Sequence, residues 1–311
     1  MRPPSSTPLL ATCALLTVAA GGCKSEGPAS DTKPAAAAEA KAEAPEAPEA
    51  SPSEAAPSEE EGPKVQLAFS RVGPEQQAAL AERTGDAKLA EAALLLAVRY
   101  EVPEGWHIYW QNPGETGLRT QIKAQVADGS GEAGETLYPA PDALVGPGGQ
   151  VSYGWHEDAV LFVPVFGETP SVDIDSRWLV CRESCIREKK KASLSLPELA
   201  QAEAADPLLA DMLSRVPEPA AERVTGTWRA EAGKDSALVL QAEAGAVEAF
   251  FPFASDAALF VASEAEAGDG LAVRYRFQGA RETFPEGQGV VRWKDGETTR
   301  WLTLALPWPE A

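Results

Sequence analysis

The sequence has few of the residues that carry chemistry. Its 311 residues include four cysteines, two histidines and two methionines. No short cysteine and histidine spacing of the zinc-binding kind is present, so we predict no metal site and no cofactor. A Gly-x-Ser-x-Gly motif, a phosphate loop and a dinucleotide fingerprint are also absent from the sequence. Thiol chemistry is therefore the one reaction that the sequence favours.

Positive charge and long apolar runs are scarce as well. The chain has 27 Lys and Arg against 47 Asp and Glu, which gives a formal net charge of -20. A nucleic-acid partner is excluded, because binding phosphates requires a basic surface. After Cys23, no apolar run approaches the roughly 18 residues of a membrane helix. We expect the mature chain to span no membrane.

The N-terminus has the pattern of an export signal. Arg2 is followed by the apolar run of residues 9–20, and Ala19-Ala-Gly-Gly-Cys23 is a small-residue run that ends in cysteine. That run resembles a bacterial lipobox, which implies that residues 1–22 are a signal peptide and that Cys23 carries the lipid. The alternative is ordinary cleavage, which leaves Cys23 as a thiol.

Export would place the mature chain in a compartment where disulfides persist. Lipidation at Cys23 and loss of Cys13 with the signal would leave two free cysteines. Lys24 stands where many inner-membrane lipoproteins have Asp, so we expect a periplasm-facing lipoprotein of the outer membrane. Residues 23–63 contain no aromatic residue and are rich in Ala, Glu and Pro. They are predicted to be a disordered tether, because such a segment buries too little surface to offset its ordering entropy.

The two remaining cysteines, Cys181 and Cys185, lie within residues 178–191. Four residues apart on a straight strand, their Cα atoms would be roughly 13 Å apart. A disulfide requires about 4.4 to 6.8 Å, so the chain must turn between them. An apolar run, Trp178-Leu-Val180, precedes the pair and an alternating run, Ala192-Ser-Leu-Ser-Leu196, follows it. These flanks favour the tip of a β-hairpin over a turn of helix.

A bridge across so short a loop has two interpretations. By restricting the unfolded chain it would stabilise the fold by only about 2 kcal/mol, which is little for a structural disulfide. Arg182, Arg187 and the lysines at 189–191 surround the pair with positive charge, which favours a reactive thiolate. The pair is therefore either redox-active or a structural staple, and spacing and charge alone leave both open.

The rest of the sequence predicts an all-β protein. Short alternating segments with frequent turn signals indicate an immunoglobulin-like sandwich at residues 64–198, a helical and Pro-rich connector at 199–222, and a second small sandwich at 223–311. Residues 91–102 fit a helix or a strand, and we favour a strand. Trp106, Ile108 and Trp110 would share one strand face, which favours core packing over a ligand platform.

Several ordered motifs resemble one known family. They are Gly105-Trp-His-Ile-Tyr-Trp-Gln-Asn-Pro-Gly-Glu-Thr-Gly117, Tyr138-Pro-Ala-Pro141, Tyr153-Gly-Trp155 and Trp178-Leu-Val-Cys-Arg-Glu-Ser-Cys185. Together they resemble the periplasmic N-terminal domain of the thiol:disulfide interchange protein DsbD, in the branch related to the copper-tolerance protein ScsB. The resemblance implies an immunoglobulin-like fold whose cysteine pair passes electrons to periplasmic thiol proteins.

The resemblance also implies roles for particular residues. Cys181 and Cys185 match the redox pair of the family. Residues 151–155 are similar to a cap loop that shields the pair, and Tyr153 or Trp155 would provide its aromatic cover. DsbD continues into a membrane electron-transfer domain and a thioredoxin-like domain, whereas this sequence ends at Ala311. The electron donor is therefore expected to be a separate membrane protein.

Three functions remain open from the sequence. The leading hypothesis is thiol-disulfide exchange through Cys181 and Cys185, a protein-disulfide reductase-like activity, with Cys185 as the attacking residue because it lies nearest the lysine run. The second is a non-enzymatic interaction module in which the bridge is structural. The third, suggested by the likeness to ScsB, is copper binding by the thiolates and a nearby histidine.

Overall fold

The computed structural model describes residues 64–127, 130–146, 148–168, 171–232, 235–255, 258–277 and 287–306. The predicted signal peptide, the lipid site at Cys23 and the tether lie outside these residues. The described part consists mainly of β-strands in several sheets, which confirms the predicted all-β fold class. None of its helices has the length and apolar character needed to cross a membrane.

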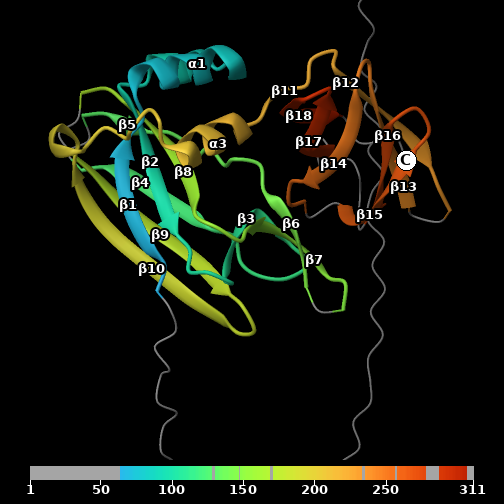
Figure 1. Cartoon of the computed structure of the whole chain (residues 1–311), viewed down its shortest axis with the longest axis horizontal. Coiled ribbons are helices and arrows are strands. Elements are labelled where there is room, and N and C mark those ends of the chain that lie inside the picture. Colours follow the sequence, from blue (N-terminus) through green and yellow to red (C-terminus); the bar gives the residue numbers. More distant parts are fainter. Residues whose placement is uncertain are drawn as a thin grey trace, which may run out of the picture. The chain divides into compact units, whose positions relative to one another are not determined.

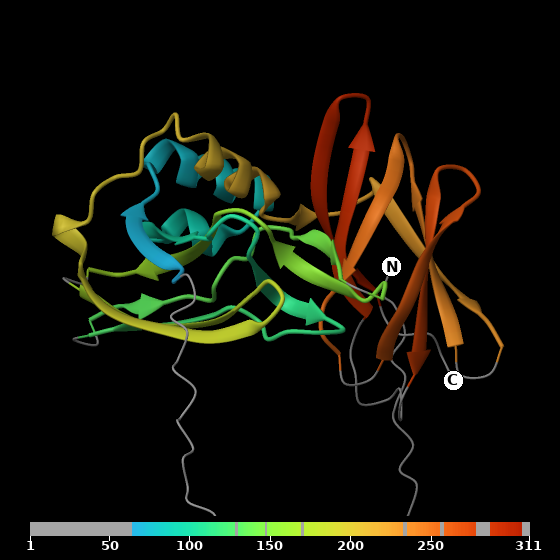
Figure 2. The same cartoon turned by 60° about the horizontal axis from the view of Figure 1, so that its bottom comes forward.

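Ten strands form the first sandwich (Figure 1). They are β1 (Gln66–Arg71), β2 (Leu94–Glu101), β3 (His107–Gly114), β4 (Gln121–Val126), β5 (Glu132–Ala133), β6 (Asp142–Val145), β7 (Val151–Trp155), β8 (Ala159–Phe166), β9 (Ser171–Cys181) and β10 (Cys185–Ser195). One sheet has the order β1-β2-β8-β5 and the other has the order β10-β9-β3-β7-β6, with β4 also paired to β9. Figure 2 shows the long curved ribbon of β10, in yellow, from a second direction.

The inner faces of these two sheets form the larger hydrophobic core. In β8, every residue from 159 to 165 is buried, and β2 pairs with both β1 and β8. The ambiguous segment before residue 102 is therefore a strand, as predicted. Ile108 and Trp110 are fully buried in the same core and Trp106 packs against it, so the prediction of core packing for these residues is confirmed.

The helices begin and end at recognisable residues. They are α1 (Pro74–Thr84), α2 (Ala87–Glu91), the short 3-10 helix η1 (Leu196–Glu198) and α3 (Pro207–Arg215). Within the predicted connector at 199–222, α3 begins only at Pro207. The reason is local: Asp206 accepts hydrogen bonds from the amides of Leu208 and Leu209, and proline suits the first helical position because it has no amide hydrogen to satisfy.

Eight further strands form the second sandwich. They are β11 (Glu218–Pro219), β12 (Val224–Ala230), β13 (Asp235–Ala242), β14 (Ala246–Pro252), β15 (Ala258–Glu266), β16 (Gly270–Phe277), β17 (Gly287–Asp295) and β18 (Thr298–Leu306). Their sheets have the orders β11-β18-β17-β14 and β12-β13-β16-β15. The sheets divide within the predicted connector, although Glu59–Ala311 forms one compact unit. The exact domain boundaries stay predictions.

The two sandwiches share buried aromatic contacts. Phe251 belongs to the larger core and its ring lies 5.6 Å from that of Tyr153. The rings of Trp110 and Phe253 are also 5.6 Å apart. In addition, the Asn112 side-chain amide donates a 2.6 Å hydrogen bond to the Pro252 carbonyl. Strands β3 and β7 of the first sandwich therefore rest against the end of β14.

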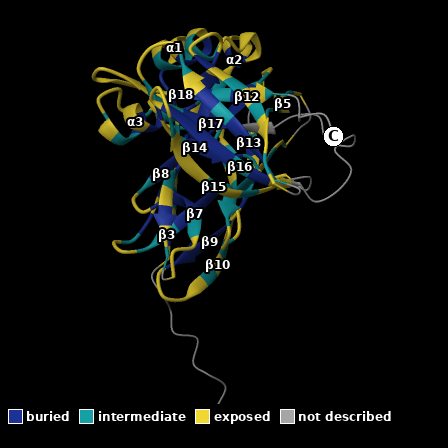
Figure 3. Ribbon diagram, turned by 90° about the vertical axis from the view of Figure 1, so that its right-hand side faces the viewer, coloured by how far each residue is buried: buried dark blue, intermediate teal, exposed yellow. Residues whose placement is uncertain are grey.

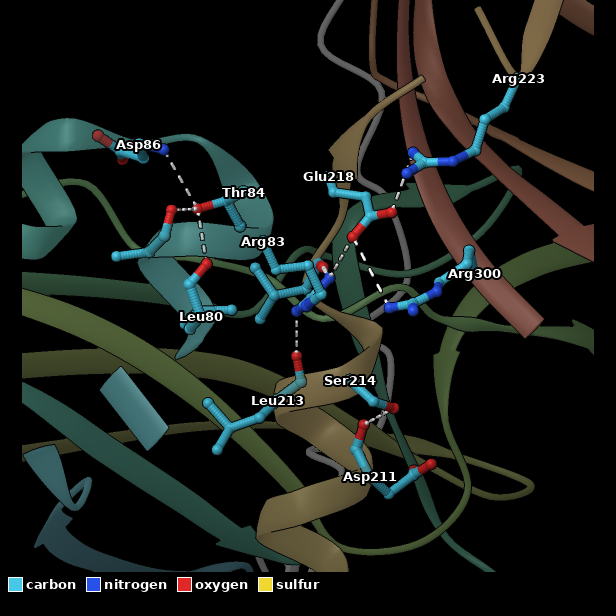
Figure 4. A network of polar contacts seen from close by, with 12 residues as sticks. Leu80, Arg83, Thr84, Asp86, Asp211, Leu213, Ser214, Glu218, Arg223 and Arg300 are labelled. Atoms are coloured by element: carbon cyan, nitrogen blue, oxygen red, sulfur yellow. Dashed lines mark hydrogen bonds and ion pairs between the residues drawn. The ribbon is translucent and has the colours of Figure 1, made fainter. Parts of the chain in front are cut away.

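A second connection between the sandwiches is polar and centres on Glu218 (Figure 4). Its side chain is 4% exposed and accepts from Arg83 of α1 at 3.4 Å and from Arg223 at 3.2 Å, with Arg300 at 3.9 Å. Arg83 also donates to the Leu213 carbonyl near the end of α3 at 2.6 Å. Burial lowers the pKa of Arg83, and the nearby Glu218 carboxylate opposes that effect. One carboxylate thus joins α1, α3 and the strands of the second sandwich.

We predict that Glu218→Gln lowers the free energy of unfolding by about 2 kcal/mol, because a half-buried guanidinium loses its charged acceptor. Asp211→Asn is the matched control. It removes an exposed i,i+4 ion pair with Arg215 and should cost no more than about 0.5 kcal/mol. Urea denaturation of both variants measures the difference. Equal losses would show that Glu218 contributes no more than a surface pair.

Candidate functional site: a cysteine hairpin

The two cysteines close the tip of the hairpin formed by β9 and β10. Cys181 is the last residue of β9, Cys185 is the first of β10, and the register places them directly opposite each other with Cα atoms 4.2 Å apart. They form a disulfide, and the turn between them is held by a 3.1 Å hydrogen bond from the Arg182 amide to the Ser184 carbonyl. The predicted hairpin is confirmed.

The core side of β9 anchors this hairpin. Trp178 is buried and packs edge-on against Tyr100 at 5.5 Å. The Tyr100 hydroxyl shares a 2.6 Å hydrogen bond with Ser176, and burial raises the pKa of that hydroxyl. Trp178 also donates from its ring nitrogen to Glu188 of β10 at 2.9 Å, and burial raises the pKa of this carboxyl group. The strand that carries Cys181 is thus fixed by buried contacts.

The two cysteines differ in exposure. Cys181 is 2% exposed and forms a small cluster with Tyr109 and Leu179 on the outer face of the sheet. Cys185 is exposed, as are the three turn residues before it. Figure 3 shows the same contrast on a larger scale, with dark blue buried segments in the inner strands, whereas the residues of β10 are exposed or intermediate. A reagent approaching from solvent reaches Cys185 first.

Strand β3 supplies the polar neighbours of Cys181. His107 is its cross-strand partner on the side away from Cys185, and directly opposed residues have Cβ atoms about 4.5 to 5.5 Å apart. The His107 Nε2 atom is hydrogen-bonded to the Tyr109 hydroxyl at 3.1 Å, and the His156 ring lies 5.7 Å from the His107 ring. Burial, and to a smaller extent the charge of His156, lowers the pKa of His107.

The turn after β3 is packed over Tyr109. Gly117 has φ of +93°, and a Cβ atom there would lie 2.4 Å from the tyrosine ring, so only glycine fits this approach. Burial raises the pKa of Tyr109, and a hydrogen bond with Thr116 partly opposes it. Thr116 in turn bonds to Ser152 at 2.7 Å. A hydrogen-bonded chain therefore runs from His107 into β7.

Positive charge lies on the same face as the exposed cysteine. Side chains alternate along a strand, so Arg187 and Lys189 share the face of Cys185, whereas Ile186 and Glu188 point toward the interior. Arg187 lies about 7 Å along the strand from Cys185. The positive charge predicted around the cysteines is therefore placed along one face of β10, beginning two residues after Cys185.

The expected shielding residues occupy other places. Residues 151–155 form strand β7, so a cap at these residues would be a strand rather than a loop. Gly154 allows the strand to approach, because a Cβ atom at this position would collide with the Ile108 carbonyl. Tyr153 is 4% exposed against Phe251, and Trp155 is 1% exposed in the core. Either ring would have to leave the core to cover the disulfide, and a shielding role for them stays a prediction.

The sequence did not single out the residues that do neighbour the cysteines. The two histidines, His107 and His156, enter the sequence analysis only as possible copper ligands beside the thiolates, and Tyr109 only as part of an aromatic motif. Side chains alternate along β3, so His107 and Tyr109 lie on the face that Ile108 and Trp110 do not use. This pattern could have identified them as outward-facing residues from the sequence alone. The described residues contain no group of three or more His, Cys, Asp or Glu side chains that could hold a metal ion.

The lowered pKa of His107 predicts a pH dependence of stability. Below about pH 6.5 the unfolded chain binds a proton that the folded site resists, so stability should fall as the pH drops from neutral through that value. The loss is complete below the folded-state pKa. His107→Gln should make the decline in unfolding free energy between about pH 7 and pH 5 shallower. Parallel curves for the variant and the unaltered protein would contradict this assignment.

Comparison with known proteins agrees with this site. Residues 75–197 match the family model described as thiol:disulfide interchange protein DsbD, N-terminal. The structure is similar to the crystal structure of the N-terminal periplasmic domain of ScsB from Proteus mirabilis. The TM-score is 0.57 at 17% identity, and the match covers 79% of this chain and 94% of that one. At this identity the likeness shows the fold alone. No curated protein sequence matches the chain.

The matched residues include both cysteines, β3 and the whole hairpin of β9 and β10. Residues 75–197 are therefore a domain of the DsbD N-terminal family.

Proposed function

We propose that this protein exchanges thiols and disulfides through Cys181 and Cys185, passing electrons from a separate donor to periplasmic thiol proteins. The observation that carries the proposal is the asymmetry of the pair: Cys185 is exposed at the tip of a hairpin, and Cys181 is buried beneath Tyr109 and Leu179. A staple would not need one accessible sulfur. A two-step exchange does, because one sulfur must meet the partner and the other must resolve the intermediate.

The exchange begins with the reduced pair. The Cys185 thiolate attacks one sulfur of a partner disulfide, a new S–S bond forms, and the partner's other sulfur leaves as a thiolate. The Cys181 thiolate then attacks the sulfur of Cys185, and the partner's first sulfur leaves. The partner has gained two electrons and this protein holds the Cys181–Cys185 disulfide.

The surroundings of the pair fit these steps. Arg187 and Lys189 add positive charge on the face of Cys185 and favour its thiolate. Trp178 and Tyr100 hold β9 in place, so Cys181 stays opposite Cys185 after the bond is broken. The two sulfur atoms therefore remain close enough for the second step without a large rearrangement.

The cellular setting is part of the same proposal. A disulfide at this position needs an oxidising compartment, which supports the periplasm, and the similar ScsB structure is described as a periplasmic domain. The electron donor would be a membrane protein separate from this chain. Lipidation at Cys23 would hold the chain at a membrane, and we propose the outer one from Lys24.

The copper-binding alternative has one observation behind it, the position of His107 opposite Cys181. The described residues lack a cluster of three ligands, and Nε2 of His107 is already hydrogen-bonded to the Tyr109 hydroxyl. The competing hypothesis is that the disulfide is purely structural. A measurement of thiol-disulfide exchange distinguishes this hypothesis from the proposal.

Trapping tests the assigned order of attack. Cys181→Ser leaves the exposed cysteine and should accumulate a mixed disulfide with a small disulfide such as oxidised glutathione, because nothing resolves it. Cys185→Ser leaves the buried cysteine and should form that adduct more slowly, on the order of tenfold. Mass spectrometry of the two variants over time measures both rates.

The double variant Cys181→Ser/Cys185→Ser is the control and should form no adduct. Faster trapping by Cys185→Ser than by Cys181→Ser would reverse the roles of the two residues. Absence of adducts in both single variants under native conditions would favour the structural bridge.

A further inference from the structure

The hairpin carries a shallow groove whose nearest lining residue on β10, Arg187, is two residues from Cys185. It has a volume of about 620 Å³. We call it the basic groove, and the side chains that define it are Leu118, Arg119, Arg177, Arg187, Glu188 and Lys189. It lies where β9, β10 and the start of β4 meet.

The basic side of the groove lies on the same strand as the exposed cysteine. Arg187 and Lys189 are two and four residues beyond Cys185 on the same strand face, which is about 7 and 13 Å. The register pairs Arg187 with Leu179 and Lys189 with Arg177, so the opposite wall comes from β9. A molecule whose sulfur reaches Cys185 can therefore place its adjoining atoms over these cations.

The charges of the groove are largely uncompensated. Arg177 pairs with Asp175 at 3.1 Å, whereas Arg187 and Lys189 have no ion pair among the described residues. Glu188 does not neutralise them, because its carboxylate is occupied by the Trp178 ring nitrogen at 2.9 Å and the Val65 amide at 3.2 Å.

A second groove farther along the hairpin lacks this excess of positive charge. Its volume is about 510 Å³, and Lys123 and Lys191 are balanced there by Asp173 and Asp175. Lys191 lies 3.7 Å from the Asp175 carboxylate. The positive charge is thus concentrated next to Cys185, in a chain whose formal net charge is -20.

We propose that the basic groove binds an acidic segment of the partner protein that flanks the partner's reactive cysteine. The inference rests on the proposed exchange function and adds the chemistry of the partner. Opposite charges placed beside the reacting sulfur atoms raise the encounter rate. Leu118, which is 46% exposed, adds an apolar contact at the far wall. The groove selects among partners by the charge next to their cysteine.

Three disulfide-linked peptides of equal length test this proposal. Their cysteine is flanked by glutamates, by glutamines or by lysines. The rate constant for oxidation of the reduced full chain is measured with each peptide and divided by the rate of that peptide with dithiothreitol. The glutamate peptide should react faster than the glutamine peptide by about tenfold at low salt. This advantage should disappear near 1 M salt, where the screening length is about 3 Å.

Two double variants locate the effect. Arg187→Gln/Lys189→Gln should remove most of the advantage of the glutamate peptide, and Lys123→Gln/Lys191→Gln should preserve it. Both variants lose two positive charges from the same face, so equal losses would mean that overall charge, not the groove, is responsible, and would overturn the proposal. Equal normalised rates for all three peptides with the unaltered chain would overturn it as well.

Two further outcomes are distinguishable. If a preference for the glutamate peptide emerges only after Glu59→Gln/Glu60→Gln/Glu61→Gln, the occupant is the acidic N-terminal segment of this chain, and the proposal of a partner segment is wrong. If no peptide oxidises the reduced chain at any rate above that of the double cysteine-to-serine variant, the proposed exchange function itself fails, and this inference fails with it.

Discussion

The antiparallel register that places Cys181 opposite Cys185 is the constraint on which the site depends. Because the side chains of a strand alternate, this register decides which residues face the core and which face the partner. A slip by one residue would turn Trp178 outward and bury Arg177. The buried contacts of Trp178 with Tyr100 and Glu188 resist such a slip. The stability of the core is therefore what keeps the two sulfur atoms in reach of each other.

Strand β9 connects the two cysteines with the rest of the site because it is paired on both edges. Along one edge lies β10 with Cys185 and the basic groove, and along the other lie β3 and β4. Cys181 is thus enclosed by its disulfide partner, by His107 and by the ring of Tyr109, while Cys185 stays at the solvent edge. The division between an accessible and a protected sulfur follows from this placement rather than from any special property of the cysteines.

Much of the architecture could be predicted from local sequence. The four-residue spacing of the cysteines required a turn, and alternation identified the burial of Ile108 and Trp110. The segment of β2 fitted a helix or a strand, and the second sandwich was predicted at residues 223–311. Strand β15 has a weak sequence signal, because its C-terminal half, which ends at Glu266, is rich in Ala and Glu, which have low β propensity.

Contacts between distant segments could not be predicted in the same way. Nothing near Cys181 in the sequence reveals that β3 is its neighbour, so His107 and Tyr109 were not recognised as site residues. The strand conformation around Tyr153 and Trp155 could not be predicted for a similar reason: the segment pairs with β3 and Tyr153 contacts the second sandwich. Family resemblance identified the cysteine pair but did not place the residues around it.

The reduction potential of the Cys181–Cys185 pair tests the central claim most directly. It can be measured on the full chain by equilibration in thiol buffers of defined potential. An exchange function predicts a value among the redox-active proteins, roughly -120 to -270 mV. A value below about -300 mV would mark a structural bridge and would contradict the account.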